Sequence, residues 1–239
     1  MEKLIKFTRE IVGIQLSTDQ VNSFQIFEDE LIYYNNQFNL TAIRDPESIR
    51  IKHFLDSLTC LLAMDLHKRP ESLIDVGTGA GFPGIALKII MPRMRLTMVE
   101  SVHKKARFCE HIAAKLGLEN VTVISERAED VGQSVEHRQA YDIAVARAVA
   151  ATPVLAEYLL PLVKLGGAAI MQKGESAHVE VQAADKAFEI LGGRLRQVIP
   201  VLLPGVVEER FLVVVDKVAV TSNAYPRKAG IPTKHPLGG

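Results

Sequence analysis

The sequence predicts an α/β protein with a seven-stranded, mostly parallel sheet, a C-terminal antiparallel hairpin and an N-terminal helical extension. After residue 73, short apolar runs alternate with amphipathic stretches, which favours a doubly wound parallel sheet. The last two β-rich runs are joined by too few residues for a parallel crossover. The residues before the first strand show helical periodicity instead. We therefore divide the chain into an extension, 1–70, a core, 71–220, and a basic tail, 221–239.

Three helices are expected in the extension. Apolar side chains at positions 4, 7 and 11 share one face of the first helix. Ser17, with Gln20 three residues later, predicts a capping box that opens the second. Asp45 followed by Pro46 predicts the start of the third, which should end before Pro70. That helix should bury Ile51, Phe54, Leu55, Leu58 and Leu62.

The core should alternate strands and helices. Apolar runs predict buried strands at 73–76, 96–99, 121–125, 143–146 and 168–171, and helices are expected at 83–90, 104–116, 153–164 and 176–191. Pro83 and Pro153 suit first turns, and Gly117 and Gly166 suit helix ends. The runs 195–203 and 211–218 predict the closing hairpin. This arrangement is more typical of nucleotide-dependent methyltransferases than of dehydrogenases.

The composition excludes several classes of protein. Among 239 residues, 28 Lys+Arg balance 28 Asp+Glu, so any nucleic-acid site must be a local patch. Two cysteines are too few for a disulfide framework, and no histidine cluster has metal spacing, so we expect no metal. No apolar run is long enough to span a membrane, and the N-terminus is too charged for a signal peptide. We expect a cytoplasmic protein, and a monomer because no apolar stripe forces dimerisation.

A glycine-rich turn between the first strand and its helix is the most informative segment. Gly77, Gly79 and Gly81 follow Asp75 at the end of the strand. Glycine allows a close approach between backbone and ligand, and the free N–H groups of a helix start can bind one. The Gly-x-Gly-x-x-Gly pattern from Gly79 matches dinucleotide-binding loops. The Asp-x-Gly-x-Gly-x-Gly pattern from Asp75 instead matches S-adenosylmethionine-dependent methyltransferases. A tight turn with no ligand is the third interpretation.

Two acidic positions indicate a nucleoside site. Glu100 ends the second strand and is placed to accept hydrogen bonds from both ribose hydroxyls. This fits the adenosine of either cofactor, and the alternative is an exposed acid at a strand end. Ala128 and Glu129 follow the third strand, where a small residue and an acid can pack beside an adenine ring and accept from its amine. Dehydrogenases usually leave that edge unread, so this pair favours the methyl donor over NAD. A solvated charge run that opens a helix is the alternative.

Several segments together resemble the bacterial RsmG/GidB family, in the same order and across nearly the whole chain. They are 39–43, 53–57, 75–85, 127–129, 145–149 and 225–237. The resemblance implies a Rossmann-like class I methyltransferase, S-adenosyl-L-methionine as donor, and N7 of guanine 527 in the 530 loop of 16S rRNA as acceptor. It also implies the small ribosomal subunit or its RNA as partner. The donor contacts that it implies are Gly77, Gly79, Phe82, Glu100, Ala128, Glu129 and Arg147, to which the loop pattern adds Asp75 and Gly81.

The residues fit that chemistry. Guanine N7 carries no proton, so methylation there needs no general base and mainly requires positioning. The motif that methylates exocyclic amines is missing at 146–149, and Cys60 and Cys109 lie in predicted helices. Arg147 ends an apolar strand and is our candidate catalytic residue. It could contact the donor, the guanine O6 or a phosphate. The alternative is an arginine that reaches solvent or pairs with an internal acid. Lys173 keeps ribose methylation open.

Basic segments suggest an RNA footprint. Lys104 opens the helix after Glu100, and the tail carries cations among prolines without an acid from Lys217 onward. Such segments suit phosphate contacts, although a solvated surface is the alternative. The expected RNA contacts are Lys104, Lys173, Arg227, Lys228 and Lys234. The target base should be flipped into the cleft. An isolated pair, His53 and Asp56, is interpreted as an ordinary helix surface. An NAD-dependent oxidoreductase and a non-enzymatic nucleotide-binding interaction protein remain alternative functions.

Overall fold

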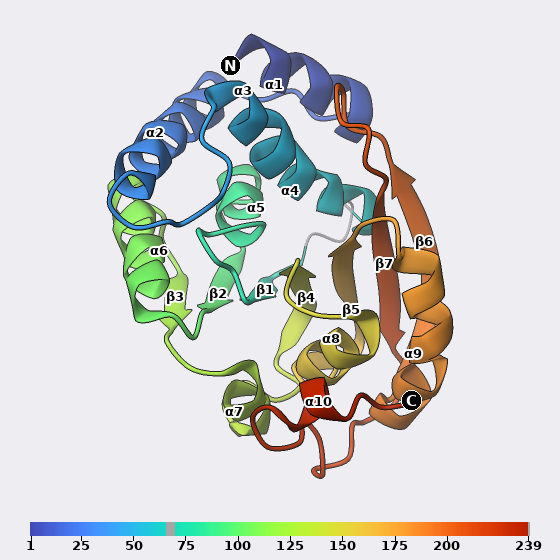
Figure 1. Cartoon of the computed structure of the whole chain (residues 1–239). Coiled ribbons are helices and arrows are strands. Elements are labelled where there is room, and N and C mark those ends of the chain that lie inside the picture. Colours follow the sequence, from blue (N-terminus) through green and yellow to red (C-terminus); the bar gives the residue numbers. More distant parts are fainter. Residues whose placement is uncertain (66–69, 239) are drawn as a thin grey trace.

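A computed structural model describes residues 1–65 and 70–238 (Figure 1). In this part of the chain, seven strands form one sheet in the order β3-β2-β1-β4-β5-β7-β6. Neighbours from β3 to β5 are parallel, whereas β7 runs antiparallel to β5 and β6. The predicted sheet and its C-terminal hairpin are confirmed. The strands are β1 (Ser72–Val76), β2 (Arg95–Val99), β3 (Val121–Ile124), β4 (Tyr141–Arg147), β5 (Val163–Lys173), β6 (Gly193–Val201) and β7 (Arg210–Lys217).

Alternate side chains of each strand enter two separate cores. On β1, Leu73 packs in one core and Ile74 in the other, and on β7, Leu212 and Val213 divide in the same way. This is the period of two that a strand requires. Since both faces are buried, the strands read as continuous apolar runs rather than as alternating ones. β3 and β6 are the exceptions, because they lie at the two edges of the sheet and are only partly buried.

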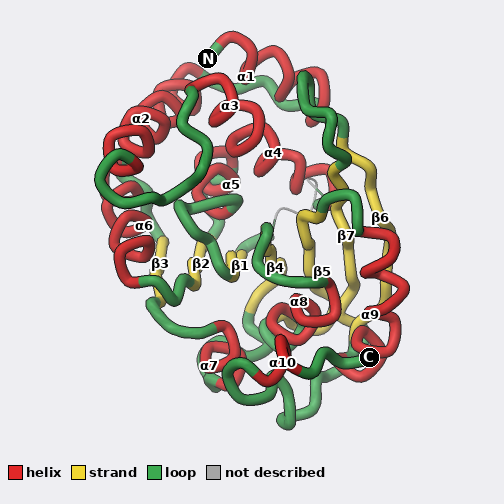
Figure 2. The backbone as a smooth tube through the Cα atoms, viewed as in Figure 1, coloured by secondary structure: helices red, strands yellow, loops and turns green. Residues whose placement is uncertain are grey.

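Helices cover both faces of the sheet (Figure 2). Those on the first face come from the extension and the early core, and those on the second come mainly from the later core. The first group is α1 (Glu2–Phe7), η1 (Thr8–Val12), α2 (Thr18–Asn35), α3 (Pro46–Ile49), η2 (Arg50–Leu55), α4 (Asp56–Leu58), η3 (Thr59–Ala63), α5 (Gly84–Ile90) and α6 (His103–Lys115). The second is α7 (Ala128–Gln133), α8 (Thr152–Leu159), α9 (Ala177–Leu191) and α10 (Ile231–Lys234).

The extension packs tightly on the core through aromatic side chains. The ring of Phe27 stacks on that of Phe82 with centroids 5.0 Å apart, and Phe54 lies 5.9 Å from the same ring. Phe24, Phe27 and Phe54 are fully buried. The elements α3, η2, α4 and η3 follow one another without a break, and η2 has π-helical geometry, which recurs at functional sites. The extension is therefore placed where it can contribute side chains to a site on the core.

Local expectations were wrong at a few positions. The helix expected at 153–164 ends at Leu159, because Pro161 follows and Val163 already pairs with Tyr141 in the sheet. Gly166 accordingly lies inside β5 rather than at a helix end. Leu62 is exposed, unlike the other apolar residues expected on its helix. The prolines and glycines of the tail predict an irregular loop rather than a helix, but the tail contains the short α10. No helix in the described ranges is long and apolar enough to cross a bilayer.

Candidate functional site

The glycine turn between β1 and α5 is held by backbone and carboxylate contacts. The N–H groups of Gly77 and Thr78 donate to the carbonyl oxygen of Val99 at 2.8 and 3.1 Å. Asp75 Oδ2 accepts from Thr78 Oγ1 at 2.6 Å and from the N–H of Gly84 at 2.8 Å. Burial raises the pKa of Asp75 to about 6, although these hydrogen bonds oppose the rise. Asp75 is fully buried beneath the turn, so it shapes the loop from below.

Glu100 braces the same loop from the neighbouring strand. Its Oε2 accepts from the N–H of Gly79 at 3.0 Å, and its Oε1 accepts from the N–H of Val102 at 2.8 Å. The side chain is only 6% exposed and lines a pocket at the ends of β1 and β2. Each carboxylate oxygen has a second lone pair, so Glu100 can still accept hydrogen bonds from a ligand.

We call this cavity of about 420 Å³ the α7 pocket. Its size falls within the usual range for small-molecule sites. The predicted residues Gly77, Glu100, Ala128 and Glu129 all line it, and two tail residues, Thr233 and Pro236, contribute as well. A Cβ on Gly77 would lie 2.6 Å from Cγ2 of Val149, and the φ of Gly77 is +70°. Only glycine fits this floor without strain.

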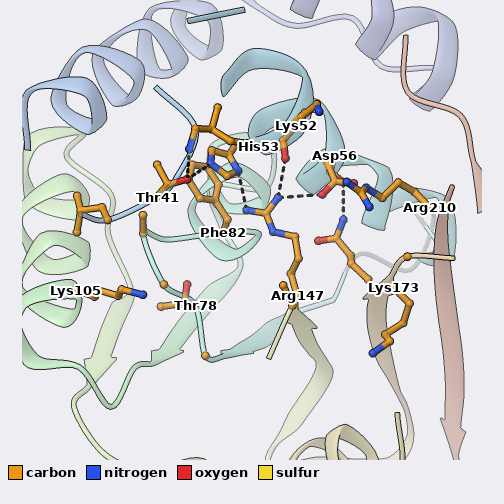
Figure 3. Close-up of a pocket in the computed structure, with 18 of the residues that line it drawn as sticks. Thr41, Lys52, His53, Asp56, Thr78, Phe82, Lys105, Arg147, Lys173 and Arg210 are labelled. Carbon is orange, nitrogen blue, oxygen red and sulfur yellow. Dashed lines mark hydrogen bonds and ion pairs between the residues drawn. The ribbon is translucent and has the colours of Figure 1, made fainter. Parts of the chain in front are cut away.

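A second cavity of about 470 Å³ adjoins it, and we call it the Arg147 pocket (Figure 3). Gly77 lines both cavities, so they meet at the glycine turn. The residues Leu40, Thr41 and Ile43 reach the Arg147 pocket from the loop before α3, and Lys52, His53 and Asp56 from the helices that follow. The extension and the core therefore build this pocket together.

Arg147 is fixed by three partners from the extension. Its Nη1 donates to Asp56 Oδ2 at 3.0 Å and to the carbonyl oxygen of Lys52 at 3.2 Å, and its Nη2 lies 3.2 Å from His53 Nδ1. The guanidinium also lies 5.1 Å from the centre of the Phe82 ring. Burial raises the pKa of Asp56, and the charge of Arg147 works against that rise. The pairing with an internal acid, one of our alternatives for Arg147, is present.

His53 is neutral in this setting. Burial, and then the charge of Arg147, lower its pKa to about 3. An arginine can only donate, so His53 Nδ1 accepts from it and the proton resides on Nε2. His53 Nε2–H then donates to Thr41 Oγ1 at 2.8 Å, and this oxygen also accepts from the N–H of Ile43 at 3.2 Å. Because the Thr41 hydroxyl proton has no acceptor among the described residues, it is free to donate into the pocket.

The walls of the Arg147 pocket are strongly basic. Five cations line it, Lys52, Lys105, Arg147, Lys173 and Arg210, against one acid, Asp56. Lys52 pairs with Glu208 at 3.7 Å, and Lys173 pairs with Glu180 at 2.6 Å. Lys105 and Arg210 form no ion pair within residues 1–65 and 70–238. The pocket is therefore suited to an anionic ligand such as a nucleotide with its phosphates.

Other predicted site residues lie elsewhere. Gly79 and Phe82 line the Arg147 pocket with Arg147 and Lys173, whereas Gly81 lines neither cavity. Lys104, Lys228 and Lys234 are exposed outside both cavities. Arg227 binds the buried carboxylate of Glu157, with Nη2 and Oε2 2.7 Å apart. All of these remain predictions as ligand contacts.

Lys217 was wrongly grouped with the surface cations of the tail. It is 1% exposed, and its Nζ donates to the carbonyl oxygens of Leu160 at 2.8 Å and Leu191 at 3.0 Å. Burial lowers its pKa to about 7. No pattern in the sequence indicates this burial, because a lysine at the end of a β-run usually reaches solvent.

Sequence reasoning also missed part of the Arg147 pocket. His53 and Asp56 were interpreted as a helix surface, but Asp56 is 5% exposed and both face Arg147. Arg210 and Gln172 carried no pattern at all. The usable signal was the segment 53–57, which combines a histidine and an acid three residues apart on the predicted third helix. Cys60 and Cys109 are buried, and burial raises the pKa of both thiols, which disfavours a nucleophilic thiolate.

Comparison with known proteins gives the family. Residues 20–204 match the family model described as rRNA small subunit methyltransferase G. The chain belongs to this family. A ribosomal RNA small subunit methyltransferase G from Roseiflexus sp. (strain RS-1) is 48% identical over 94% of this chain and 95% of its own. One from Alkaliphilus oremlandii (strain OhILAs) is 43% identical over 99% of both chains.

Solved structures agree with the fold. A 16S rRNA (adenine(1408)-N(1))-methyltransferase from Catenulisporales acidiphilia aligns with a TM-score of 0.51 and 16% identity, over 64% of this chain and 87% of that one. MtNAS in complex with MTA and tNA aligns with a TM-score of 0.54 and 19% identity, over 81% and 69%. With the sheet order above, these similarities confirm the Rossmann-like methyltransferase fold of this family member.

Within residues 1–65 and 70–238, no group of three or more His, Cys, Asp or Glu side chains is arranged to hold a metal ion.

Proposed function

We propose that this family member transfers a methyl group from S-adenosyl-L-methionine to N7 of a guanine in 16S rRNA, guanine 527 of the 530 loop. The family membership supports methylation of small-subunit ribosomal RNA. The observation that carries the rest is that Gly77 lines both cavities, so that a donor in one and an acceptor base in the other meet at the glycine turn.

The α7 pocket fits the donor. Glu100, Ala128 and Glu129 all line it, and we assign Glu100 to the ribose hydroxyls and the other two to the adenine. The bare Cα of Gly77 leaves room where any Cβ would meet Val149. When bound, the donor supplies a methyl group that is already activated by its positive sulfonium. The protein then has only to hold the two reactants in line.

The Arg147 pocket fits the acceptor nucleotide. His53 stacks on Phe82 with ring centroids 4.6 Å apart, and its partly exposed ring offers an aromatic surface on which a flipped base can lie. The free hydroxyl proton of Thr41 can donate to the guanine O6 and leave the N7 lone pair open to the donor. Lys105 and Arg210 can neutralise the phosphates on either side of the flipped nucleotide. The neutral His53 and the ion-paired Asp56 hold Arg147 in place, and no group is required to remove a proton.

Calorimetric titration with S-adenosylmethionine and with NAD tests the donor. Glu100→Ala should weaken S-adenosylmethionine binding by about a hundredfold, since hydrogen bonds to a charged acceptor contribute roughly 1.5–3 kcal/mol each. Glu110→Ala, an exposed acid on α6, is the matched control and should leave the affinity unchanged. Saturable binding of NAD with none of S-adenosylmethionine would favour the oxidoreductase and refute the proposal.

Tritiated methyl transfer onto small subunits and onto free 16S rRNA, followed by mapping of the modified base, tests the acceptor. Label at guanine N7 in the 530 loop is the expected result. Label elsewhere in the RNA, or on protein alone, would contradict the assignment. Donor binding without any transfer would favour a non-enzymatic nucleotide-binding protein.

A further inference from the structure

The C-terminal tail is fastened to the core rather than extended into solvent. The guanidinium of Arg138 donates to the carbonyl oxygens of Thr221, Ser222 and Tyr225 at 2.8, 2.8 and 2.6 Å. Arg227 also ties the tail to the core through its ion pair with Glu157, whose side chain is completely buried. Because a buried carboxylate without its partner is costly, this pair fixes where the chain runs after residue 227.

These contacts of Arg138 and Arg227 bring the last turn of the tail to the α7 pocket. Thr233 and Pro236 line this pocket together with Glu100, Ala128 and Glu129. In Figure 1, α10 lies beside α8 and near α7, although almost a hundred residues separate α7 from α10. One side of the pocket is therefore made of a segment that the chain reaches only at its end.

Glu129 joins the tail to the pocket. Its Oε1 accepts from the N–H of Gly230 at 2.8 Å and from the hydroxyl of Tyr158 at 3.3 Å. The Tyr158 hydroxyl already donates its proton to Glu129. The hydroxyl of Thr233 therefore donates to the Tyr158 oxygen, 3.2 Å away. Oε2 accepts from no described residue and is not sealed off by the protein. Glu129 therefore accepts a hydrogen bond from the tail with one oxygen and keeps the other available to a ligand in the pocket.

We propose that the tail is a wall of the donor site: Thr233 and Pro236 cover the adenine, Glu129 Oε1 anchors the tail, and Glu129 Oε2 accepts from the adenine amine. This rests on the proposed function, because it takes the α7 pocket as the adenosine site. It also gives the tail a role other than the phosphate contacts that its lysines suggested.

Tail docking and donor binding are then coupled. A docked tail supplies part of the surface that the adenine contacts, so the donor binds the docked form more tightly than the undocked one. The coupling is reciprocal. A bound donor must therefore favour the docked tail, in the docking equilibrium, by the same factor by which the docked tail raises donor affinity. One lost apolar wall of a small-molecule site corresponds to roughly a tenfold change in affinity.

The first experiment measures donor affinity by calorimetry with S-adenosylmethionine and S-adenosylhomocysteine. A chain that ends at Gly230 lacks Thr233 and Pro236 but keeps the Arg227–Glu157 pair and the Gly230 contact. It should bind both compounds about tenfold more weakly than the full chain. Tyr158→Phe in the full chain removes the hydroxyl that links Glu129 to Thr233, and should weaken binding several-fold even where the shortened chain folds poorly. Asn223→Ala, an exposed tail residue outside the pocket, is the control.

The second experiment reads the reciprocal effect. Saturating S-adenosylhomocysteine should slow tryptic cleavage after Lys228 and Lys234 by about the same factor, because cleavage needs the tail to open locally. A shortened chain that binds the donor as tightly as the full chain, or a tail cut equally fast with and without ligand, overturns this inference alone. A full chain that binds no adenosyl compound overturns the proposed function as well.

Discussion

Removing one partner of the Asp56–Arg147 pair should destabilise the protein more than removing both. Asp56→Ala leaves the charge of Arg147 unpaired, and Arg147→Met leaves that of Asp56 unpaired. The Arg147 side chain is only 15% exposed and the Asp56 side chain only 8%. At 3.0 Å the attraction is about 5.5 kcal/mol with an effective dielectric constant of 20, before desolvation is counted. Burial nevertheless raises the pKa of Asp56, so desolvation offsets much of this attraction.

The expected magnitudes follow from that balance. Each single substitution should lower the free energy of unfolding by about 3–5 kcal/mol, as is usual when a buried pair loses one partner. The double substitution should recover roughly 1–4 kcal/mol of that loss, because it removes both buried charges. The rate of methyl transfer should fall in all three variants. It should not recover in the double variant, which regains stability but still lacks the cation of Arg147. The two readouts therefore separate folding from function.

Urea denaturation followed by far-ultraviolet circular dichroism measures the stability cycle, and the tritium assay measures transfer. Lys6→Ala, which removes an exposed pair with Glu10 at 4.0 Å, is the control and should change stability by no more than about 1 kcal/mol. Additive single losses, with a coupling energy near zero, would refute the claim that Asp56 holds Arg147. Recovery of transfer in the double variant would refute a role for the cation itself.

Two further substitutions test the glycine turn and His53. Gly77→Ala should lower the free energy of unfolding by about 1–3 kcal/mol and abolish tight donor binding, because the new Cβ would lie 2.6 Å from Val149. Gly79→Ala is the control: a Cβ there meets open space, so only the backbone strain should lower stability. Equal melting temperatures for the two variants would contradict this reasoning. For His53, the pKa is about 3 in the folded protein and about 6.5 unfolded, so stability is complete above pH 6.5 and should fall by up to about 1.4 kcal/mol per pH unit below it. His53→Gln should flatten that slope in denaturation measured from pH 7 to 4, and an unchanged slope would show that folding does not lower the pKa of His53.

The sheet could be predicted because its signals are local. Runs such as 73–76 and 143–146 are apolar throughout, as strands buried on both faces must be. The short link between β6 and β7 fixed their antiparallel pairing without any knowledge of the rest. The end of α8 could not be predicted in the same way. Val163 and Leu165 continue an apolar helical pattern, and only their pairing with β4 assigns the segment to β5.

The α7 pocket was also predictable, whereas the Arg147 pocket was not. Gly77, Glu100 and Glu129 follow strand ends, and strand ends of a parallel sheet gather at one edge. His53 and Asp56 come from a helix, and their sequence says only that they share a face. Whether that face meets solvent or Arg147 depends on how the extension docks on the sheet. That docking is decided by packing among distant aromatic residues, which no local pattern encodes.

This docking argues against an extension that folds by itself. Phe27 and Phe54 pack on each other with ring centroids 5.3 Å apart and also on the ring of Phe82 in the core, and all three side chains belong to a single apolar cluster with Leu73 of β1. Aromatic pairs of this kind each add roughly 0.5–1.5 kcal/mol beyond their buried area. The extension and the core should therefore unfold in one cooperative step, with equal calorimetric and van't Hoff enthalpies in a scanning experiment. Two resolved transitions would mean that residues 1–70 form a separate unit, and that the Arg147 pocket can come apart while the sheet stays folded.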